Sequence, residues 1–262
     1  LRPPRRGWRS SPHRAIVNHP MIRIEALVKV YDGFRAVDGL SLEVGTGQIL
    51  GLVGPNGAGK TTTLRCLAGI IPPTSGRVTI AGFDLQTHPL EARQRLAFVP
   101  DEPHLFDHLT ALDHLTLFSR LYGVADGPAR AEALLEEAGL RDQRLSFPSE
   151  LSRGMKQKLV VACALLHRPE VLVLDEPLTG LDPAAMRRMK RTVRDTATAG
   201  ASVIVSSHML QLVEEICDRI LIVNRGKKVL IGTLDEIRLQ FPDVDADADL
   251  ETLFMRATGA DQ

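Results

Sequence analysis

The sequence predicts an α/β fold, in which helices cover a mainly parallel β-sheet. From Val171 to Cys217, apolar runs that predict strands alternate with helical patterns, which is typical of parallel sheets. Near residue 54 a glycine-rich turn joins a buried strand to a helix. Between about residues 101 and 168 only helical patterns occur, which indicates a helical subdomain inserted into the α/β core.

Composition restricts the class of function. The 262 residues contain 32 Lys and Arg and 32 Asp and Glu, so no basic field favours a nucleic-acid partner. Cys66, Cys163 and Cys217 lie far apart, which argues against metal or disulfide roles and fits a reducing, cytoplasmic setting. The longest apolar run, Leu159–Leu166, is well short of the roughly 18 to 20 residues that cross a bilayer. If a membrane is involved, another chain must span it.

Residues 1–20 differ from the rest, because arginines and prolines alternate there without apolar periodicity. This pattern predicts a disordered basic arm, and it lacks the apolar centre of a signal peptide. The arm could contact anionic lipid headgroups. Alternatively, Met21 is the true start of the protein.

The first folded segments are two predicted strands, Ile22–Val30 and Ala36–Val44, which form an antiparallel β part at the N-terminal side. Tyr31 lies between them and either packs in a turn or stacks on an adenine ring. After a break at Pro72–Gly76, strands are predicted at Arg77–Ile80 and Leu96–Val99.

A phosphate-binding loop follows the apolar run Ile49–Val53 and precedes a helical pattern. It matches G-x-x-x-x-G-K-T in full, in the strand-to-helix setting that this motif requires. The glycines let backbone N–H groups approach phosphate oxygens, and the helix adds its positive end. Lys60 is expected to reach the β- and γ-phosphates and the Thr61 hydroxyl to hold Mg²⁺. These features predict a P-loop NTPase core. The expected ligand residues are Gly54, Pro55, Asn56, Gly57, Ala58, Gly59, Lys60, Thr61 and Thr62.

Further helices and strands are predicted before and after the apolar strand Val171–Leu174, which ends in two carboxylates. The subdomain helices are expected at Ala111–Tyr122, Ala129–Ala138 and about Gly154–His167, and the later elements at Pro183–Ala199, Ser202–Ser206 and Met209–Cys217. Asp175 and Glu176 end the apolar strand Val171–Leu174, where α/β sheets place ligands. Asp175 is expected to bind Mg²⁺ through its water shell, and Glu176 to act as general base. A carboxylate pair that merely caps a turn is the alternative.

The stretch Leu151-Ser152-Arg153-Gly154-Met155-Lys156-Gln157 resembles the LSGGQ signature of ABC (ATP-binding cassette) ATPases, in an LSRGM variant. The other family motifs follow in order over Ile22–Gly259. They are Tyr31 at the A-loop, Asp101 at the Q-loop position, Leu181-Asp182-Pro183 as the D-loop and His208 as the switch histidine.

This resemblance implies ATP and Mg²⁺ as cofactors, with Glu176, His208 and Lys60 as catalytic residues. It also implies that two cassettes pair head to tail, so that Ser152 and Gly154 of one contact the ATP held by the other. His208 would contact the γ-phosphate and hold Glu176 and the attacking water in line. Asp101 departs from the usual glutamine, and it is expected to reach the metal only through a water.

The C-terminal stretch Leu250–Gly259 resembles an ending common among ATPases of ABC-2-type exporters, although a terminal helix for dimer packing is an alternative. The expected organisation is an arm at 1–20, an ATPase domain at 21–240 with its helical subdomain at about 101–168, and an extension at 241–262. In the family, a permease helix docks beside the Q-loop. Here Leu105 and Phe106 either line that groove or belong to the subdomain core.

We therefore expect an ATP-hydrolysing subunit, peripheral on the cytoplasmic face of the membrane. It would pair with a second ATPase subunit, identical or different, and drive a separate transmembrane permease, with export favoured over import. A soluble ABC protein of DNA repair or translation is disfavoured by the single cassette and the absence of zinc spacing, a coiled-coil insertion or a basic face. Intact Lys60, Asp175, Glu176 and His208 argue against a non-hydrolysing regulatory cassette.

Overall fold

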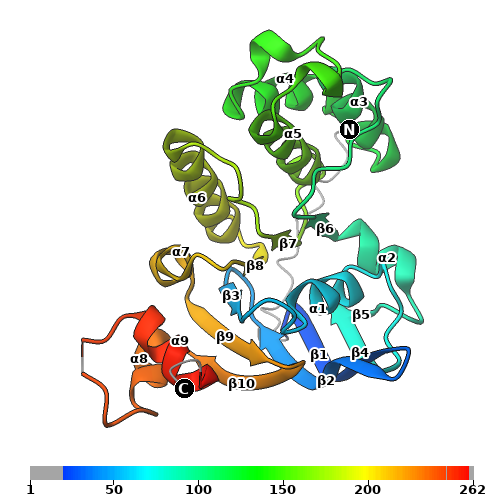
Figure 1. The fold of residues 1–262 in the computed structure, drawn as a ribbon. Helices are drawn as coiled ribbons and strands as arrows, with labels where there is room; N and C mark the ends of the chain where they lie inside the picture. The colour runs from blue at the N-terminus through cyan, green and yellow to red at the C-terminus, as the bar shows by residue number, and fades with distance from the viewer. Residues whose placement is uncertain (1–19, 246, 260–262) are drawn as a thin grey trace, which may run out of the picture.

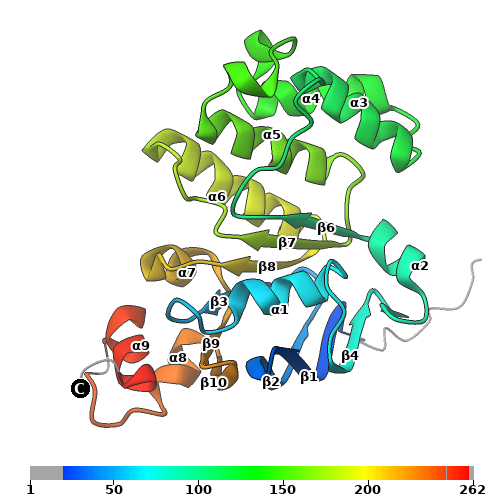
Figure 2. The same cartoon turned by 45° about the vertical axis from the view of Figure 1, so that its right-hand side comes forward.

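The structure is a computed structural model that describes residues 20–245 and 247–259. Its strands form two sheets, and three helices form a separate layer remote from the N-terminal sheet (Figure 1 and Figure 2). The predicted arm at 1–20 lies outside the described residues except for Pro20. Within the part of the chain that is described, no helix has the length and apolar character needed to span a bilayer.

The N-terminal sheet is antiparallel, as predicted, with strand order β2-β1-β4-β5. Its strands are β1 (Ile22–Tyr31), β2 (Phe34–Val44), β4 (Ser75–Ile80) and β5 (Phe83–Asp84). Tyr31 was expected between two strands, but it ends β1 and pairs with Phe34. The reason is the short turn Asp32–Gly33, whose φ values of 45° and 83° suit a tight hairpin.

The second sheet has the order β10-β9-β3-β8-β7-β6, parallel throughout except for the edge strand β10. This confirms the predicted mainly parallel sheet. The strands are β3 (Ile49–Val53), β6 (Leu96–Val99), β7 (Val171–Asp175), β8 (Ser202–Ser206), β9 (Arg219–Asn224) and β10 (Lys227–Gly232). Because their carboxyl ends meet at one edge, residues that follow β3, β6, β7 and β8 are brought together there.

Helices cover both faces of this sheet, so its strands are apolar on both sides. Val171 and Val173 of β7 join the core that includes α1, whereas Leu172 and Leu174 join the core under α5, α6 and α7. The helices are α1 (Lys60–Leu67), α5 (Arg153–Leu165), α6 (Pro183–Thr198) and α7 (Leu210–Ile216).

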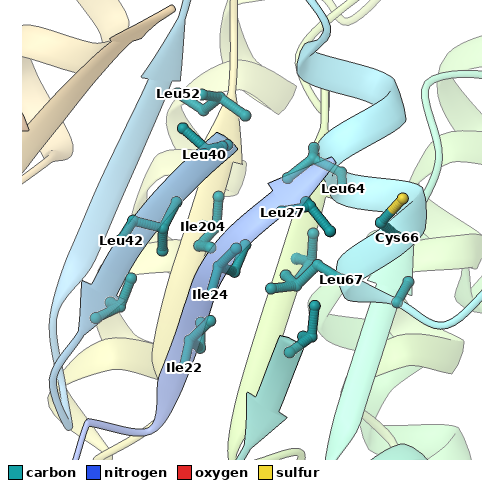
Figure 3. Packing of buried hydrophobic residues seen from close by; sticks show 14 of the residues in the cluster. Ile22, Ile24, Leu27, Leu40, Leu42, Leu52, Leu64, Cys66, Leu67 and Ile204 are labelled. Carbon is teal, nitrogen blue, oxygen red and sulfur yellow. The ribbon is translucent and has the colours of Figure 1, made fainter. Parts of the chain in front are cut away.

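The first of these cores lies between α1 and both sheets (Figure 3). Leu64 and Leu67 of α1 are buried in the same cluster as Ile24 and Leu27 of β1 and Ile204 of β8. Burying a Leu or Ile side chain stabilises a fold by about 1.5–3 kcal/mol. The start of α1 is therefore held firmly against the sheet edge where the phosphate-binding loop begins.

The helical subdomain consists of α3 (Ala111–Leu121), α4 (Gly127–Glu137) and α5, close to the ranges predicted. It has its own core, to which Leu115, Leu135 and Leu159 contribute fully buried side chains. A capping box at Thr110 begins α3, because its side chain accepts a hydrogen bond from Asp113 N and the Asp113 carboxylate accepts one from Thr110 N.

The C-terminal segment packs on the second sheet. Leu250 and Leu253 of α9 (Leu250–Thr258) are fully buried in a cluster with Val53 and Ile222. A short helix, α8 (Leu234–Arg238), joins this cluster through Ile237, and α2 (Pro89–Gln94) lies between β5 and β6 in the chain. The sequence interpretation did not include α2, α8, β5, β9 or β10.

Candidate nucleotide-binding and hydrolysis site

The phosphate-binding loop leaves the buried strand β3 and enters α1 at Lys60. Gly59 caps the helix with φ 98°, and a Cβ there would lie 2.3 Å from Ala36 O, so only glycine fits. No side chain caps α1, so the N–H groups of its first turn are left for a ligand. Along the loop, Gly54 and Ala58 are buried, Gly59 and Thr62 half-buried, and Pro55, Asn56, Gly57 and Thr61 exposed.

Lys60 is buried at the start of α1, where its Nζ donates to Gly54 O at 2.7 Å and to Pro55 O at 3.3 Å. Burial lowers the pKa of Lys60, and the negative charges of Glu176 and Asp175 oppose that lowering. The lysine therefore shares one electrostatic environment with the two carboxylates that end β7. Among the described residues only the neutral carbonyl oxygens of Gly54 and Pro55 accept its hydrogen bonds, which leaves its charge for an anion.

Asp175 ends β7 and is 2% exposed. It pairs in register with Ser206 at the end of β8, and Ser206 Oγ donates to Asp175 Oδ1 at 2.5 Å. A buried carboxylate needs such partners, because an unpaired buried charge is costly. The serine holds the carboxylate at the carboxyl edge of the sheet.

Glu176 has φ 48°, which is unusual for a residue other than glycine. Its backbone N donates to Ser206 Oγ at 3.1 Å and to Ser206 O at 3.2 Å, so β8 fixes this turn. The Glu176 carboxylate Oε2 lies 2.8 Å from His208 Nδ1 and accepts from His208 N at 3.3 Å. The structure thus brings the predicted base and the predicted switch histidine into direct contact.

The donor set fits a nucleotide with Mg²⁺. Among the described residues no group of three or more His, Cys, Asp or Glu side chains could hold a metal ion. Mg²⁺, however, is commonly bound by one or two protein oxygens together with phosphate oxygens and waters. The exposed Thr61 at the start of α1 and Asp175 supply protein oxygens of that kind.

The sequence of this chain matches the family described as "ABC transporter" over residues 37–179. It is 36% identical to the linearmycin resistance ATP-binding protein LnrL of Bacillus subtilis (strain 168), over 83% of this chain and 70% of that protein. It is 39% identical to the Nod factor export ATP-binding protein I of Burkholderia pseudomallei (strain 1710b), over 80% of this chain and 70% of that protein. A solved structure described as the ATP binding subunit of an ABC transporter superposes with TM-score 0.86 and 33% identity, over 90% of this chain and 99% of the other.

The chain belongs to the ABC transporter family. It is an ATP-binding subunit of the family's ATPase type, which confirms the family, fold and enzyme class predicted from the motifs. The roles of individual residues in this ABC subunit remain predictions.

Three residues of the ABC subunit that were predicted to contact ATP lie outside the cluster around Lys60. Tyr31 is 43% exposed at the end of β1, with Lys29 Nζ 5.0 Å from the centre of its ring. Its accessible ring is compatible with stacking on a base. Ser152 caps α5 by accepting from Met155 N at 3.3 Å, with Gly154 in the first turn. Among the described residues no hydrogen bond joins Ser152 to the phosphate-binding loop.

Asp101, expected near the metal, lies beside the signature segment. Its Oδ1 is 3.6 Å from Arg153 Nη2, and within the described part of the chain no hydrogen bond joins it to Lys60, Asp175 or Glu176. Its metal-binding role therefore remains a prediction without support from a direct contact.

A groove of about 100 Å³ lies beside the loop that follows β6 in this ABC subunit. Phe106 is 57% exposed and stacks on His114 at 5.9 Å, whereas Leu105 packs on the subdomain core. The lining residues are Ala97, Phe98, His104, Leu105, Phe106, His114, Phe118, Tyr122, Val160, Cys163, Ala164 and His167. Leu105 is half-buried, so it both lines the groove and contacts the subdomain core, whereas Phe106 is accessible.

Ser206 is the residue of the candidate site that sequence reasoning missed. The Ser206 hydroxyl donates a hydrogen bond to the Asp175 carboxylate and accepts one from the backbone N–H of Glu176. A signal was present, because a hydroxyl ends the apolar run Ser202–Ser206 at the edge where Asp175 ends its own strand. Assigning it required the order and register of the strands.

Proposed function

We propose that this chain hydrolyses ATP as one of two cassettes that drive export through a separate transmembrane permease. The observation that carries the hydrolytic part is the linked set Asp175–Ser206–Glu176–His208, with Lys60 sharing its electrostatic field. Such a set joins a phosphate-binding group to a positioned base, which hydrolysis requires.

The phosphates would lie on the first turn of α1, where free N–H groups and the helix dipole favour negative charge. Lys60 would exchange its two carbonyl acceptors for phosphate oxygens. Thr61 and Asp175 would hold Mg²⁺, which supplies charge neutralisation as the phosphate is transferred. Tyr31 would stack on the base, and the backbone of Gly54–Thr62 would surround the phosphate chain.

Glu176 would orient the attacking water and accept its proton. A carboxylate that is fixed before the substrate binds lowers the barrier, because less reorganisation accompanies the reaction. The Glu176 side chain is 15% exposed and is held by both the His208 imidazole and the His208 backbone. His208 is 62% exposed, so it is free to contact a terminal phosphate as well.

The proposal includes two partners, a second cassette and a permease. Ser152 caps the start of α5 and Gly154 lies in its first turn. The first-turn N–H groups that Ser152 does not cap would serve as an anion site, which would close over ATP bound by the other subunit. The exposed Phe106 and the groove beside it suit an apolar element of the permease. Export is favoured by the relative named for Nod factor export and by the C-terminal resemblance. The subunit would then be peripheral on the cytoplasmic face of the membrane.

The Glu176→Gln variant tests the hydrolytic role. Losing the base is expected to lower ATP turnover by roughly 10²- to 10⁴-fold while ATP still binds, and to accumulate an ATP-bound dimer that sizing chromatography detects. Glu132→Gln on the exposed surface of α4 is the matched control. Turnover of Glu176→Gln within a few-fold of the wild type would exclude this role.

The transport role needs its own experiment. A multi-span membrane protein encoded beside this gene should co-purify with the subunit, and ATP-driven accumulation in inside-out vesicles should show the cargo moving away from the ATPase side. Movement toward that side would make the subunit part of an importer. Failure to associate with any membrane protein would favour a soluble ABC ATPase.

A further inference from the structure

Arg153 lies where three segments of the chain meet. It is the first residue of α5, between the loop that follows β6 and the loop that follows β7. Its Nη2 is 3.6 Å from Asp101 Oδ1 on the first loop. Its aliphatic arm lies along Gly180 on the second, since a Cβ at Gly180 would lie 3.4 Å from Arg153 Cδ and 3.5 Å from Nε.

Arg153 and Gly180 lie in van der Waals contact. A Cβ at Gly180 would still lie at ordinary contact distance from the arginine arm, and it is the φ of 77° that favours glycine at this position. A Cβ at Gly154 would lie 3.3 Å from Gly180 O, so the first turn of α5 approaches this loop closely at Gly180. The guanidinium group of Arg153 lies beside the loop that follows β6, while much of the side chain stays exposed to solvent.

The Asp101 carboxylate has no closer partner than Arg153 among the described residues. Asp101 Oδ1 is inaccessible to solvent and accepts no hydrogen bond among the described residues. Such an atom is costly to leave unpaired, so the guanidinium charge is the group that compensates it. The side chains of Arg153 and Asp101 remain 55% and 47% exposed, and exposed pairs contribute little to stability. The pair can therefore open and close readily.

We propose that Asp101 and Arg153 form a charge clamp that sets the position of the loop 100–106 relative to the start of α5. Arg153 is then a positioning residue, because it acts through the segments it holds. The same loop carries His104, Leu105 and Phe106 into the groove. The clamp itself does not rest on the proposed function.

Charge reversal tests the clamp in the full-length protein. Asp101→Lys and Arg153→Glu should each speed amide hydrogen exchange in residues 100–106, by about three- to five-fold, as expected for loss of an exposed pair. The double variant restores opposite charges, and exchange should return to within twofold of the wild type. Arg153→Lys, which keeps the charge, should stay close to the wild type. Independent effects that multiply in the double variant would overturn the proposal.

ATP turnover separates the clamp from a metal role of Asp101. If Asp101 positions through Arg153, the double variant should recover most of the turnover that each single variant loses. If Asp101 binds the metal, lysine at 101 cannot replace it, and the double variant should stay as low as Asp101→Lys. A double variant whose ATP turnover stays as low as that of Asp101→Lys therefore overturns the clamp. A double variant in which the two effects on amide exchange simply multiply overturns it as well. A wild-type protein with no turnover above Lys60→Ala would instead refute the proposed function, and the exchange measurement would still decide the clamp.

Discussion

Replacing Ser206 with alanine removes the hydroxyl that donates to Asp175 Oδ1 at 2.5 Å. Asp175 is 2% exposed, so water cannot readily replace this donor. Hydrogen bonds to charged groups contribute about 1.5–3 kcal/mol, which is the expected loss in the free energy of unfolding. Glu176 N keeps its bond to Ser206 O at 3.2 Å, so the turn after β7 should survive. The loss therefore falls mainly on Asp175.

If Asp175 holds Mg²⁺, its orienting partner also matters for the metal. Removing such partners typically weakens metal binding by about 10- to 100-fold. The Ser206→Ala variant should therefore need correspondingly more Mg²⁺ for half-maximal ATP turnover at saturating ATP. Urea unfolding measures the first effect and a magnesium titration the second.

Ser202→Ala is the matched control for this prediction. Ser202 is fully buried on the same strand, and its Oγ donates to Gly45 O at 2.6 Å, a neutral acceptor far from the site. Its loss should cost about 0.5–1.5 kcal/mol and leave the magnesium requirement unchanged. Equal magnesium midpoints for the two variants would refute the reasoning that links Ser206 to the metal through Asp175.

Two further predictions concern the groove. Leu105→Ser should lower the free energy of unfolding by about 1–3 kcal/mol, because Leu105 packs on the subdomain core. The exposed Phe106 contributes less, so Phe106→Ser should change that free energy by less than about 0.5 kcal/mol. Equal losses in urea unfolding would contradict this distinction. Burial lowers the pKa of His167 from 6.5 to about 4, so the unfolded chain binds more protons in that window and stability should fall as the pH drops through it. When the pH is lowered from 7 to 5, the free energy of unfolding of His167→Phe should fall by about 1 kcal/mol less than that of the wild type, after allowance for solvent screening. Urea unfolding at the two pH values measures this difference. The control is His108→Phe, at an exposed position, which should lose as much stability as the wild type.

The parallel sheet was predictable because its strands are buried on both faces. Runs such as Val171–Leu174 leave no polar face, and their spacing between helical patterns indicates parallel order. The same signal exists at Ile220–Val223 in β9, but the sequence interpretation stopped at Cys217 and missed it. The edge strand β10 was harder to predict, since Lys227 and Lys228 give it the polar character of exposed edges.

Site residues that follow strands were predictable, and contacts between loops were not. Lys60, Asp175 and His208 lie just beyond β3, at the end of β7 and beyond β8, so the topology alone brings them to one edge. The pairing of Asp101 with Arg153 depends on the path of a long side chain over Gly180. No periodicity or spacing encodes that path, because it is set by the packing of α5 on the sheet.

Glu176 shows how the backbone supports the proposed chemistry. Its φ of 48° places it in the left-handed region, where a residue with a Cβ is disfavoured by roughly 1–2 kcal/mol. Glycine would relieve that cost, and glycines occupy most left-handed positions of this chain among the described residues. A glutamate is tolerated because its backbone N–H donates to two oxygens of Ser206 and its carboxylate contacts the His208 ring. Ala26, Asp32, Ala81, Arg168 and Arg225 also have positive φ values, between 45° and 53°, so the backbone conformation alone does not mark the base. The contacts of Glu176 with Ser206 and His208 are what support that role.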